Sequence, residues 1–377
     1  MANSRMLNFL LLAGTVVLLS LTVISFLKIV SSKTPDFAVF YGAGLDLTVE
    51  KNVYQDKSLF TAFNYPPQTA VMYLPFLLFP YRVAQGLFAA LTLCLIPVCV
   101  WLSLRILRDT LSWQRLLFLT NIAVLAFPIK FTLGMGQSNI LALFLFLTSF
   151  FFYQQQRKTV VGILLAIAVI VKPILLFVGL FYLFRRQWKT LGIFAITILL
   201  FSVIPLALQG VSIYQYYLST QIPEVIKSSG LAVYYNQSLM GALSRLPLSM
   251  TQAHILYLAG VVCILWGTFR TLLSKEENDA FLLSRLFLAL LLLNILSWQH
   301  HFAFLLFPFM TLGSRLWKSG QRRKQLLFFI ALVLVSLNIK DPKMFTYSPL
   351  SVVLSHGFFG AFLLWILFLP LSKKKKY

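Results

Sequence analysis

The sequence predicts an all-α integral membrane protein that crosses the bilayer many times. Of its 377 residues, 59% are apolar and only 11% are charged, and the mean hydropathy is +0.84. Soluble domains carry about 25% charged residues, so this chain has too little charge to cover a soluble surface. Its apolar residues form long unbroken runs, whereas a membrane barrel would show alternating strands of ~10 residues. We therefore exclude the soluble, disordered, disulfide-scaffold and barrel classes.

Twelve apolar runs are long enough, or nearly so, to cross a bilayer. A straight crossing takes about 20 residues and several runs are shorter, so we expect about twelve crossings, within a range of about ten to thirteen. The runs are 6–27, 83–104, 115–129, 138–153, 157–171, 173–184, 189–208, 254–273, 280–298, 300–314, 325–339 and 350–370. The apolar stretch 67–80 has only 14 residues, contains Pro75 and is closed by Pro80, which predicts a re-entrant or interfacial helix.

The positive charge predicts how the chain is oriented. The net charge is +22, and most of the 32 basic residues lie in short loops between apolar runs. If both termini lie in the cytoplasm and the segment 67–80 enters and leaves the membrane on the outer side, most of these basic residues face the cytoplasm. Two long outer segments then remain, 28–82 and 209–253, and loops of that length in a compact protein are usually functional. We find no linker or internal repeat and expect a single domain over 1–377.

The first outer segment begins with a carboxylate at the membrane boundary. Asp36 follows a proline and precedes the apolar stretch 37–41. Apolar surroundings make a carboxylate more basic, and such a group can take the proton of a substrate hydroxyl. The later acids Asp46, Glu50 and Asp56 are typical of solvated loops. These residues alone allow two interpretations of Asp36, a general base or an ordinary loop acid.

Three basic residues depart from the cytoplasmic bias of positive charge: Lys130, Lys172 and Arg245. Lys172 lies between two apolar runs and precedes Pro173, where an ionisable group must snorkel or pair with an anion. The planar guanidinium of Arg245 can bind a phosphate through two parallel hydrogen bonds. For Lys172 and Arg245 the sequence allows two interpretations, binding of a phosphate group or a structural role.

Amides and a histidine pair occupy the remaining outer positions. The amides are Gln137, Asn139, Asn236 and Gln237. Amide side chains suit contacts with sugar hydroxyls and the capping of helices equally well. A histidine at 300 or 301 could donate a hydrogen bond to a phosphate leaving group, and Trp298 could stack on a sugar. No further ligands at metal-binding spacing accompany the histidines, so we expect no metal. The sequence has neither a Walker loop nor a dinucleotide fingerprint.

Taken in order, these motifs resemble glycosyltransferase family 87. They are DFAVFYGAG, NVY, FNYPP, GQSN, a Lys-Pro after an apolar run, NQS and SWQHH, and they cover about 33–310. The family consists of polytopic enzymes with the C-type glycosyltransferase fold. It includes mannosyltransferases that use polyprenol-phosphate-mannose.

The resemblance implies a membrane hexosyltransferase that moves a sugar, mannose in the best-known cases, from a polyprenyl-phosphate donor to a lipid or glycan acceptor. Transfer would occur with inversion at the outer face of the cytoplasmic membrane. The family pattern puts the catalytic aspartate at Asp36 and the functional histidine at His300 or His301. The substrate-binding candidates are Tyr41, Tyr65, Gln137, Asn139, Lys172, Asn236, Gln237, Arg245 and Trp298.

We expect no cofactor, because the polyprenyl-phosphate sugar is itself the donor substrate. We expect contacts with membrane lipids and none with nucleic acid. A lipid or amphiphile transporter is the alternative function. Such transporters usually show two related halves with broken helices and ionisable groups at the membrane midplane. Here the polar motifs gather on one predicted face and the halves show no symmetry, which favours the enzyme.

Overall fold

The structure, a computed structural model, consists of helices wherever it describes the chain. The described residues are 13–17, 20, 24, 27–28, 31–49, 51–54, 63–227, 230–272, 278–343 and 349–369. Within these ranges, β-structure is limited to one isolated bridge between Asn236 and Trp298. The predicted all-α class is therefore confirmed. Most of the predicted first crossing, together with Glu50 and Asp56, lies outside the described residues.

The helices follow one another with short connections. The first half contains α2 (Pro35–Thr48), α3 (Pro67–Val71), η1 (Leu74–Leu78), α4 (Tyr81–Ile106), α5 (Trp113–Leu125), α6 (Phe127–Met135), α7 (Asn139–Gln154), α8 (Lys158–Val171), η2 (Pro173–Leu175), α9 (Leu176–Phe184) and α10 (Trp188–Gln209). The second half contains α11 (Ser212–Tyr216), η3 (Tyr217–Gln221), α12 (Ile222–Lys227), α13 (Leu239–Leu243), α14 (Met250–Leu272), α15 (Asp279–Leu293), η4 (Gln299–Leu305), α16 (Leu306–Ser319), α17 (Arg322–Ser336), η5 (Pro349–Ser355) and α19 (His356–Phe368).

Four stretches of the described chain are long and apolar enough to cross a membrane. They are Tyr81–Ile106, Trp188–Gln209, Met250–Arg270 and Leu350–Phe368. A fifth crossing results if α5 and α6, which meet at an angle of 67°, form one broken span. The bend falls at Ala126, whose ψ is 130°, and Pro128 in the first turn of α6 has no N–H with which to continue the hydrogen bonds of α5. The segment 67–80 forms the short helices α3 and η1.

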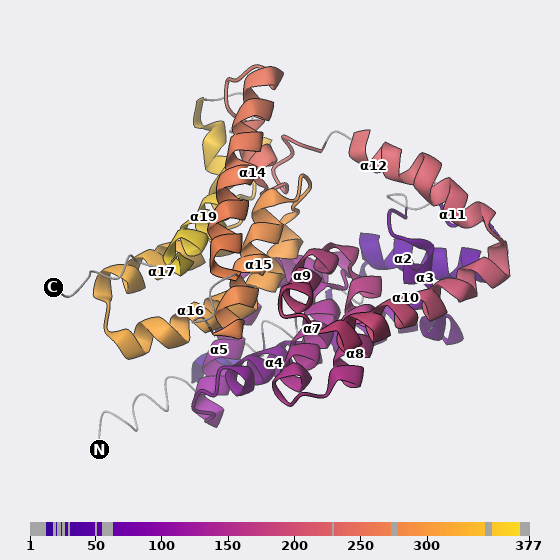
Figure 1. Ribbon diagram of the computed structural model, residues 1–377, viewed down its shortest axis with the longest axis horizontal. Helices are drawn as coiled ribbons and strands as arrows, with labels where there is room; N and C mark the ends of the chain where they lie inside the picture. The colour runs from indigo at the N-terminus through magenta and orange to yellow at the C-terminus, as the bar shows by residue number, and fades with distance from the viewer. Residues whose placement is uncertain are drawn as a thin grey trace.

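Two apolar cores hold these helices together. The larger core joins α4, α7, α8, α15, η4, α16 and α19, and Figure 1 shows α14, α15 and α19 standing upright beside one another while α8 and α10 lie across the other part of the molecule. The smaller core is aromatic and lies beneath α2, where Phe37 stacks on Phe88 with ring centroids 4.9 Å apart and Phe40 stacks on Tyr73 at 4.7 Å. This smaller core fixes the position of α2, and α2 carries Asp36.

The close contact between α8 and α10 gives a test of this packing. A Cβ added at Gly162 would lie 2.7 Å from the carbonyl oxygen of Thr190 and 2.8 Å from the Cβ of Ile193. Because the helices would have to separate, we expect Gly162→Ala to lower stability by about 1–3 kcal/mol. The measurement is the midpoint of thermal unfolding in detergent. Gly179→Ala on α9 adds the same methyl where nothing lies within 4 Å. Equal losses in both variants would contradict the packing.

Candidate active site

Asp36 occupies the first turn of α2, and the chain entering that helix is tied to α4. Thr34 caps the helix in an extended conformation, and Pro35 occupies the first helical position, where its missing N–H costs nothing. The backbone N–H and the hydroxyl of Thr34 both donate to Oε1 of Gln85, each over 3.1 Å. A carboxylate in a first turn is also favoured by the helix dipole. Asp36 is half-buried in this setting.

A chain of hydrogen bonds links Asp36 to a buried ammonium group. Nε2 of Gln137 donates to Oδ2 of Asp36 over 2.8 Å. Nζ of Lys172 donates to Oε1 of Gln137 and to the hydroxyl of Tyr65, each over 2.6 Å. The same Nζ lies 4.9 Å from the centroid of the Tyr65 ring. Four residues that are far apart in sequence therefore form one connected group, which we call the Asp36 group.

Breaks between helices bring Gln137 and Lys172 to this position. Gln137 follows Gly136, which ends α6 with φ +70°. A Cβ at Gly136 would lie 2.7 Å from the Cβ of Phe37, so only glycine lets the end of α6 approach α2 this closely. Lys172 is extended, with φ −142° and ψ 92°, because Pro173 follows it. Neither side chain therefore belongs to a continuous helix.

Burial shapes the electrostatics of the Asp36 group. Removal from water raises the pKa of Asp36, while the Gln137 hydrogen bond and the Lys172 charge act in the opposite direction. Lys172 is only 1% exposed, and burial lowers its pKa to about 7, with Asp36 opposing that change. A carboxylate with a raised pKa is a stronger base toward a hydroxyl than an ordinary aspartate.

The histidine pair lies at the beginning of η4 and is buried. The rings of His300 and His301 are perpendicular, with centroids 4.5 Å apart, and both interact electrostatically with Lys172. Nδ1 of each ring has no hydrogen-bond partner among the described residues. Buried polar atoms are usually paired, so two such atoms near Lys172 indicate a place for a polar atom of a ligand.

Asn139 acts on the histidine pair through the backbone. Its Nδ2 donates to the carbonyl oxygen of His300 over 3.0 Å, and the hydroxyl of Thr132 donates to the same oxygen over 3.1 Å. The sequence predicted Asn139 as a substrate ligand, and in the structure its Nδ2 contacts the backbone of the histidine segment. Thr132 was missed by the sequence analysis. Its signal was a lone hydroxyl in the apolar helix α6, next to the GQSN motif.

Asn236 and Gln237 anchor the segment that leads to the histidines. Asn236 donates to the carbonyl of Ile295 over 3.0 Å and accepts from the N–H of Ser297 over 3.0 Å. The backbone N–H of Gln237 donates to the carbonyl of Ser297 over 2.7 Å. The Gln237 side chain donates to the carbonyl of Leu354 and accepts from the N–H of Gly357. Both amides are fully buried and engaged with backbone, which favours a positioning role.

The three other predicted ligands have contacts outside the Asp36 group. The guanidinium of Arg245 donates to the hydroxyl of Ser355 over 2.8 Å and to the carbonyl oxygen of Val233 over 2.6 Å, a structural arrangement. Trp298 is half-buried beside Gly230. Tyr41 donates to the carbonyl of Phe79 over 3.0 Å and lines a separate cavity. The structure thus assembles Asp36, Tyr65, Gln137, Lys172 and the histidines from the longer list that the sequence proposed.

Comparison with known proteins identifies the family. The model of glycosyltransferase family 87 matches residues 63–298, which is more than half of the chain. The chain belongs to glycosyltransferase family 87. This match confirms the family that the ordered motifs predicted, and it includes Tyr65, Gln137 and Lys172.

Curated relatives are similar over a shorter part of their own length. A polyprenol-phosphate-mannose-dependent alpha-(1-2)-phosphatidylinositol mannoside mannosyltransferase of Mycolicibacterium smegmatis is 26% identical over 65% of this chain and 60% of its own. The protein of the same name from Mycobacterium tuberculosis is 24% identical over 68% of this chain and 63% of its own. An alpha-(1-2)-phosphatidylinositol pentamannoside mannosyltransferase of M. tuberculosis is 27% identical over 64% of this chain and 56% of its own. The chain thus matches about three fifths of the length of these relatives.

In this family member an apolar cavity of about 780 Å³ lies next to the segment that follows the histidine pair in sequence. Phe302 and Ala303, which follow the pair, line one part of it together with residues of α5, α6, α16 and α17. Its other end carries charge, where Asp109 accepts from Arg115 over 2.6 Å and lies 3.4 Å from Lys318. A concave space lined mainly by apolar side chains suits an apolar ligand. Among the described residues, no three His, Cys, Asp or Glu side chains are placed to hold a metal ion.

Proposed function

We propose that this chain transfers a mannosyl residue from polyprenyl-phosphate-mannose to a hydroxyl of a lipid or glycan acceptor. The observation that carries the proposal is the Asp36 group, in which a half-buried carboxylate is connected through Gln137 to the buried ammonium of Lys172. Family membership supports glycosyl transfer, and the relatives' names supply the donor and a phosphatidylinositol mannoside as one acceptor class. The site would face the outer side of the cytoplasmic membrane, with both termini in the cytoplasm.

In the proposed reaction Asp36 is the general base. The acceptor oxygen attacks the anomeric carbon while its proton passes to a carboxylate oxygen of Asp36. The bond from the anomeric carbon to the phosphate oxygen breaks, and polyprenyl phosphate leaves with the electron pair. Attack opposite the leaving group inverts the anomeric centre. A retaining reaction would need a second carboxylate about 5 Å away, and the contacts described for Asp36 are with Gln137 and Lys172 instead.

Lys172 and the histidine pair act on the phosphate in this proposal. Lys172 is a buried amine that carries a positive charge when protonated, and His300 and His301 each present an unpaired Nδ1 near it. A cation and hydrogen-bond donors in a water-poor site stabilise the charge that develops on a leaving phosphate. The polyprenyl chain would then enter the apolar cavity beside Phe302 and Ala303.

The proposal includes the C-type glycosyltransferase fold with about twelve crossings. Helices α7, α8 and the pair η2–α9 are apolar but each shorter than a straight span. In a C-type arrangement such helices cross with the help of their neighbours, because the protein interior satisfies their ends.

Transfer is tested with purified protein in proteoliposomes that contain labelled polyprenyl-phosphate-mannose and phosphatidylinositol mannoside. We expect label in the acceptor, with the anomeric configuration of the donor inverted. Movement of the labelled donor between leaflets without any transfer would contradict the proposal and support the transporter instead. Retention of the donor configuration would contradict the single displacement while leaving the transfer itself intact.

The pH dependence follows from the raised pKa of Asp36. The base must be ionised, so kcat/KM falls as the pH drops through that pKa, which lies above the ordinary value of 3.8. The Gln137 hydrogen bond holds the pKa down, so Gln137→Leu should move the acidic limb to still higher pH. The measurement is kcat/KM against pH for both proteins. An acidic limb that does not move in Gln137→Leu would contradict the assignment.

A further inference from the structure

A second cavity, of about 370 Å³, lies on the side of α2 that faces away from Asp36. Ala38, Tyr41, Gly42 and Leu45 line it, and their spacing of three and four residues puts them on one face of the helix. Phe40, Ala43 and Leu47 follow Asp36 at intervals of four, seven and eleven residues and are buried on the other face. We call the second space the Tyr41 cavity, and it is distinct from the Asp36 group.

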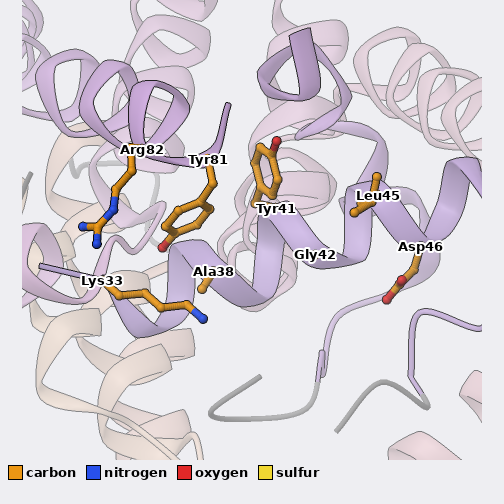
Figure 2. A pocket seen from close by; sticks show the side chains of 8 residues that line it. All are labelled: Lys33, Ala38, Tyr41, Gly42, Leu45, Asp46, Tyr81 and Arg82. Carbon is orange, nitrogen blue, oxygen red and sulfur yellow. The ribbon is translucent and has the colours of Figure 1, made fainter. Parts of the chain in front are cut away.

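The Tyr41 cavity has opposite charges at its two ends. Figure 2 shows Lys33 and Arg82 at one end, Asp46 at the other, and the rings of Tyr41 and Tyr81 between them. The two rings meet edge to face, with centroids 5.5 Å apart. Two cations attract a phosphate, while a carboxylate repels an anion and accepts hydrogen bonds from hydroxyls. A ligand carrying both a phosphate and hydroxyls therefore fits in one direction only.

The surroundings place this cavity at the boundary of the lipid-facing surface. Arg82 is the second residue of α4, which is long and apolar enough to cross a membrane. Leu78 at the end of η1 is 82% exposed, and Val83 and Leu87 on α4 are also exposed. Exposed apolar side chains next to a spanning helix belong in lipid. Arg82 precedes Val83 and Leu87 at the beginning of this helix, where a cation lies at the level of the phospholipid headgroups.

We propose that the Tyr41 cavity binds the headgroup of an anionic, hydroxylated phospholipid. The phosphate lies between Lys33 and Arg82, and the headgroup hydroxyls reach Asp46. The lined face of α2 from Ala38 to Leu45 is about 10 Å long, which accommodates a phosphate with a glycerol-sized group. Tyr41, which the sequence predicted as a substrate ligand, belongs to this site. The inference does not depend on the proposed transfer reaction, and its test measures binding.

The experiment is native mass spectrometry of the purified full-length protein titrated with three lipids: phosphatidylglycerol, phosphatidic acid and phosphatidylcholine. We expect phosphatidylglycerol to bind most tightly and phosphatidylcholine least. Arg82→Gln and Lys33→Gln should each weaken phosphatidylglycerol binding by about tenfold, since each removes one charged contact. Asp46→Asn should abolish the preference for phosphatidylglycerol over phosphatidic acid, because it changes only the end of the cavity that receives the headgroup hydroxyls.

The control is Lys51→Gln, which removes the same charge from an exposed lysine just beyond α2 and outside the cavity. Its affinity should equal that of the wild type. An equal loss in Lys51→Gln would reduce the effect to general charge attraction and overturn the site. Equal binding of all three lipids would overturn it as well. If free glycerol phosphate competed at the same concentration as the lipid, the assignment to a membrane lipid would be wrong. Arg82→Lys should restore part of the affinity if the variants are folded.

Discussion

Replacing Asp36 with asparagine is expected to slow sugar transfer by at least about 10²-fold, the usual contribution of a general base. Asparagine keeps the shape of the side chain, and its Oδ1 can still accept the hydrogen bond from Gln137. It cannot take the proton of the acceptor hydroxyl. Donor binding should therefore persist while kcat collapses. The measurements are single-turnover transfer from labelled donor and donor binding at equilibrium.

Glu224→Gln is the matched control for this prediction. Glu224 is an exposed acid on α12, in the other long outer segment, and its loss should leave transfer unchanged. Wild-type turnover in Asp36→Asn would exclude Asp36 as the base. A loss of donor binding equal to the loss of rate would instead assign Asp36 to substrate binding.

Replacing Lys172 with methionine is expected to weaken the apparent donor affinity by about tenfold or more. Methionine fills a similar volume without a charge, so its burial carries no desolvation cost. It removes the donors to Tyr65 and Gln137 and the positive charge beside the histidine pair. The phosphate of the donor then loses a charged contact, and the measurement is donor titration of the purified variant.

Two further cations separate this role from general effects of charge and stability. Lys130 is exposed on α6, and Lys130→Met should leave the donor affinity unchanged. Arg245 donates to main-chain carbonyls and Ser355, so Arg245→Met should lower the unfolding temperature while the remaining folded protein binds donor normally. Normal donor affinity in Lys172→Met, or a specific loss in Arg245→Met, would reverse these assignments.

The composition and the order of the motifs were sufficient for the class and the family. Apolar runs require helices because a bilayer offers no partner for an open backbone, so the all-α prediction followed from hydropathy alone. Asp36 and Lys172 could also be selected, since each is an ionisable residue bordered by apolar sequence and a proline. Both signals are local, and local signals are visible in one sequence.

The roles of the amide side chains could not be predicted from local sequence signals. Gln137, Asn139 and Asn236 look alike in sequence, as short polar interruptions between apolar runs. In the structure, Gln137 joins Asp36 to Lys172, whereas Asn139 and Asn236 hold the backbone around the histidines. An amide has donors and acceptors that suit substrate and backbone equally, so its role depends on the groups that the fold brings near it.

The same reason explains the separation of Tyr41 from Asp36. The two residues share one motif and stand five positions apart, and the sequence grouped them around one substrate. The helix turns about 100° per residue, so α2 presents them to different surroundings: Asp36 to Gln137, and Tyr41 to Phe79 and Arg82. Sequence established which chemical groups line this part of the protein. The packing of helices from distant parts of the chain determined which of those groups act together, because their contacts join residues that are 100 or more positions apart.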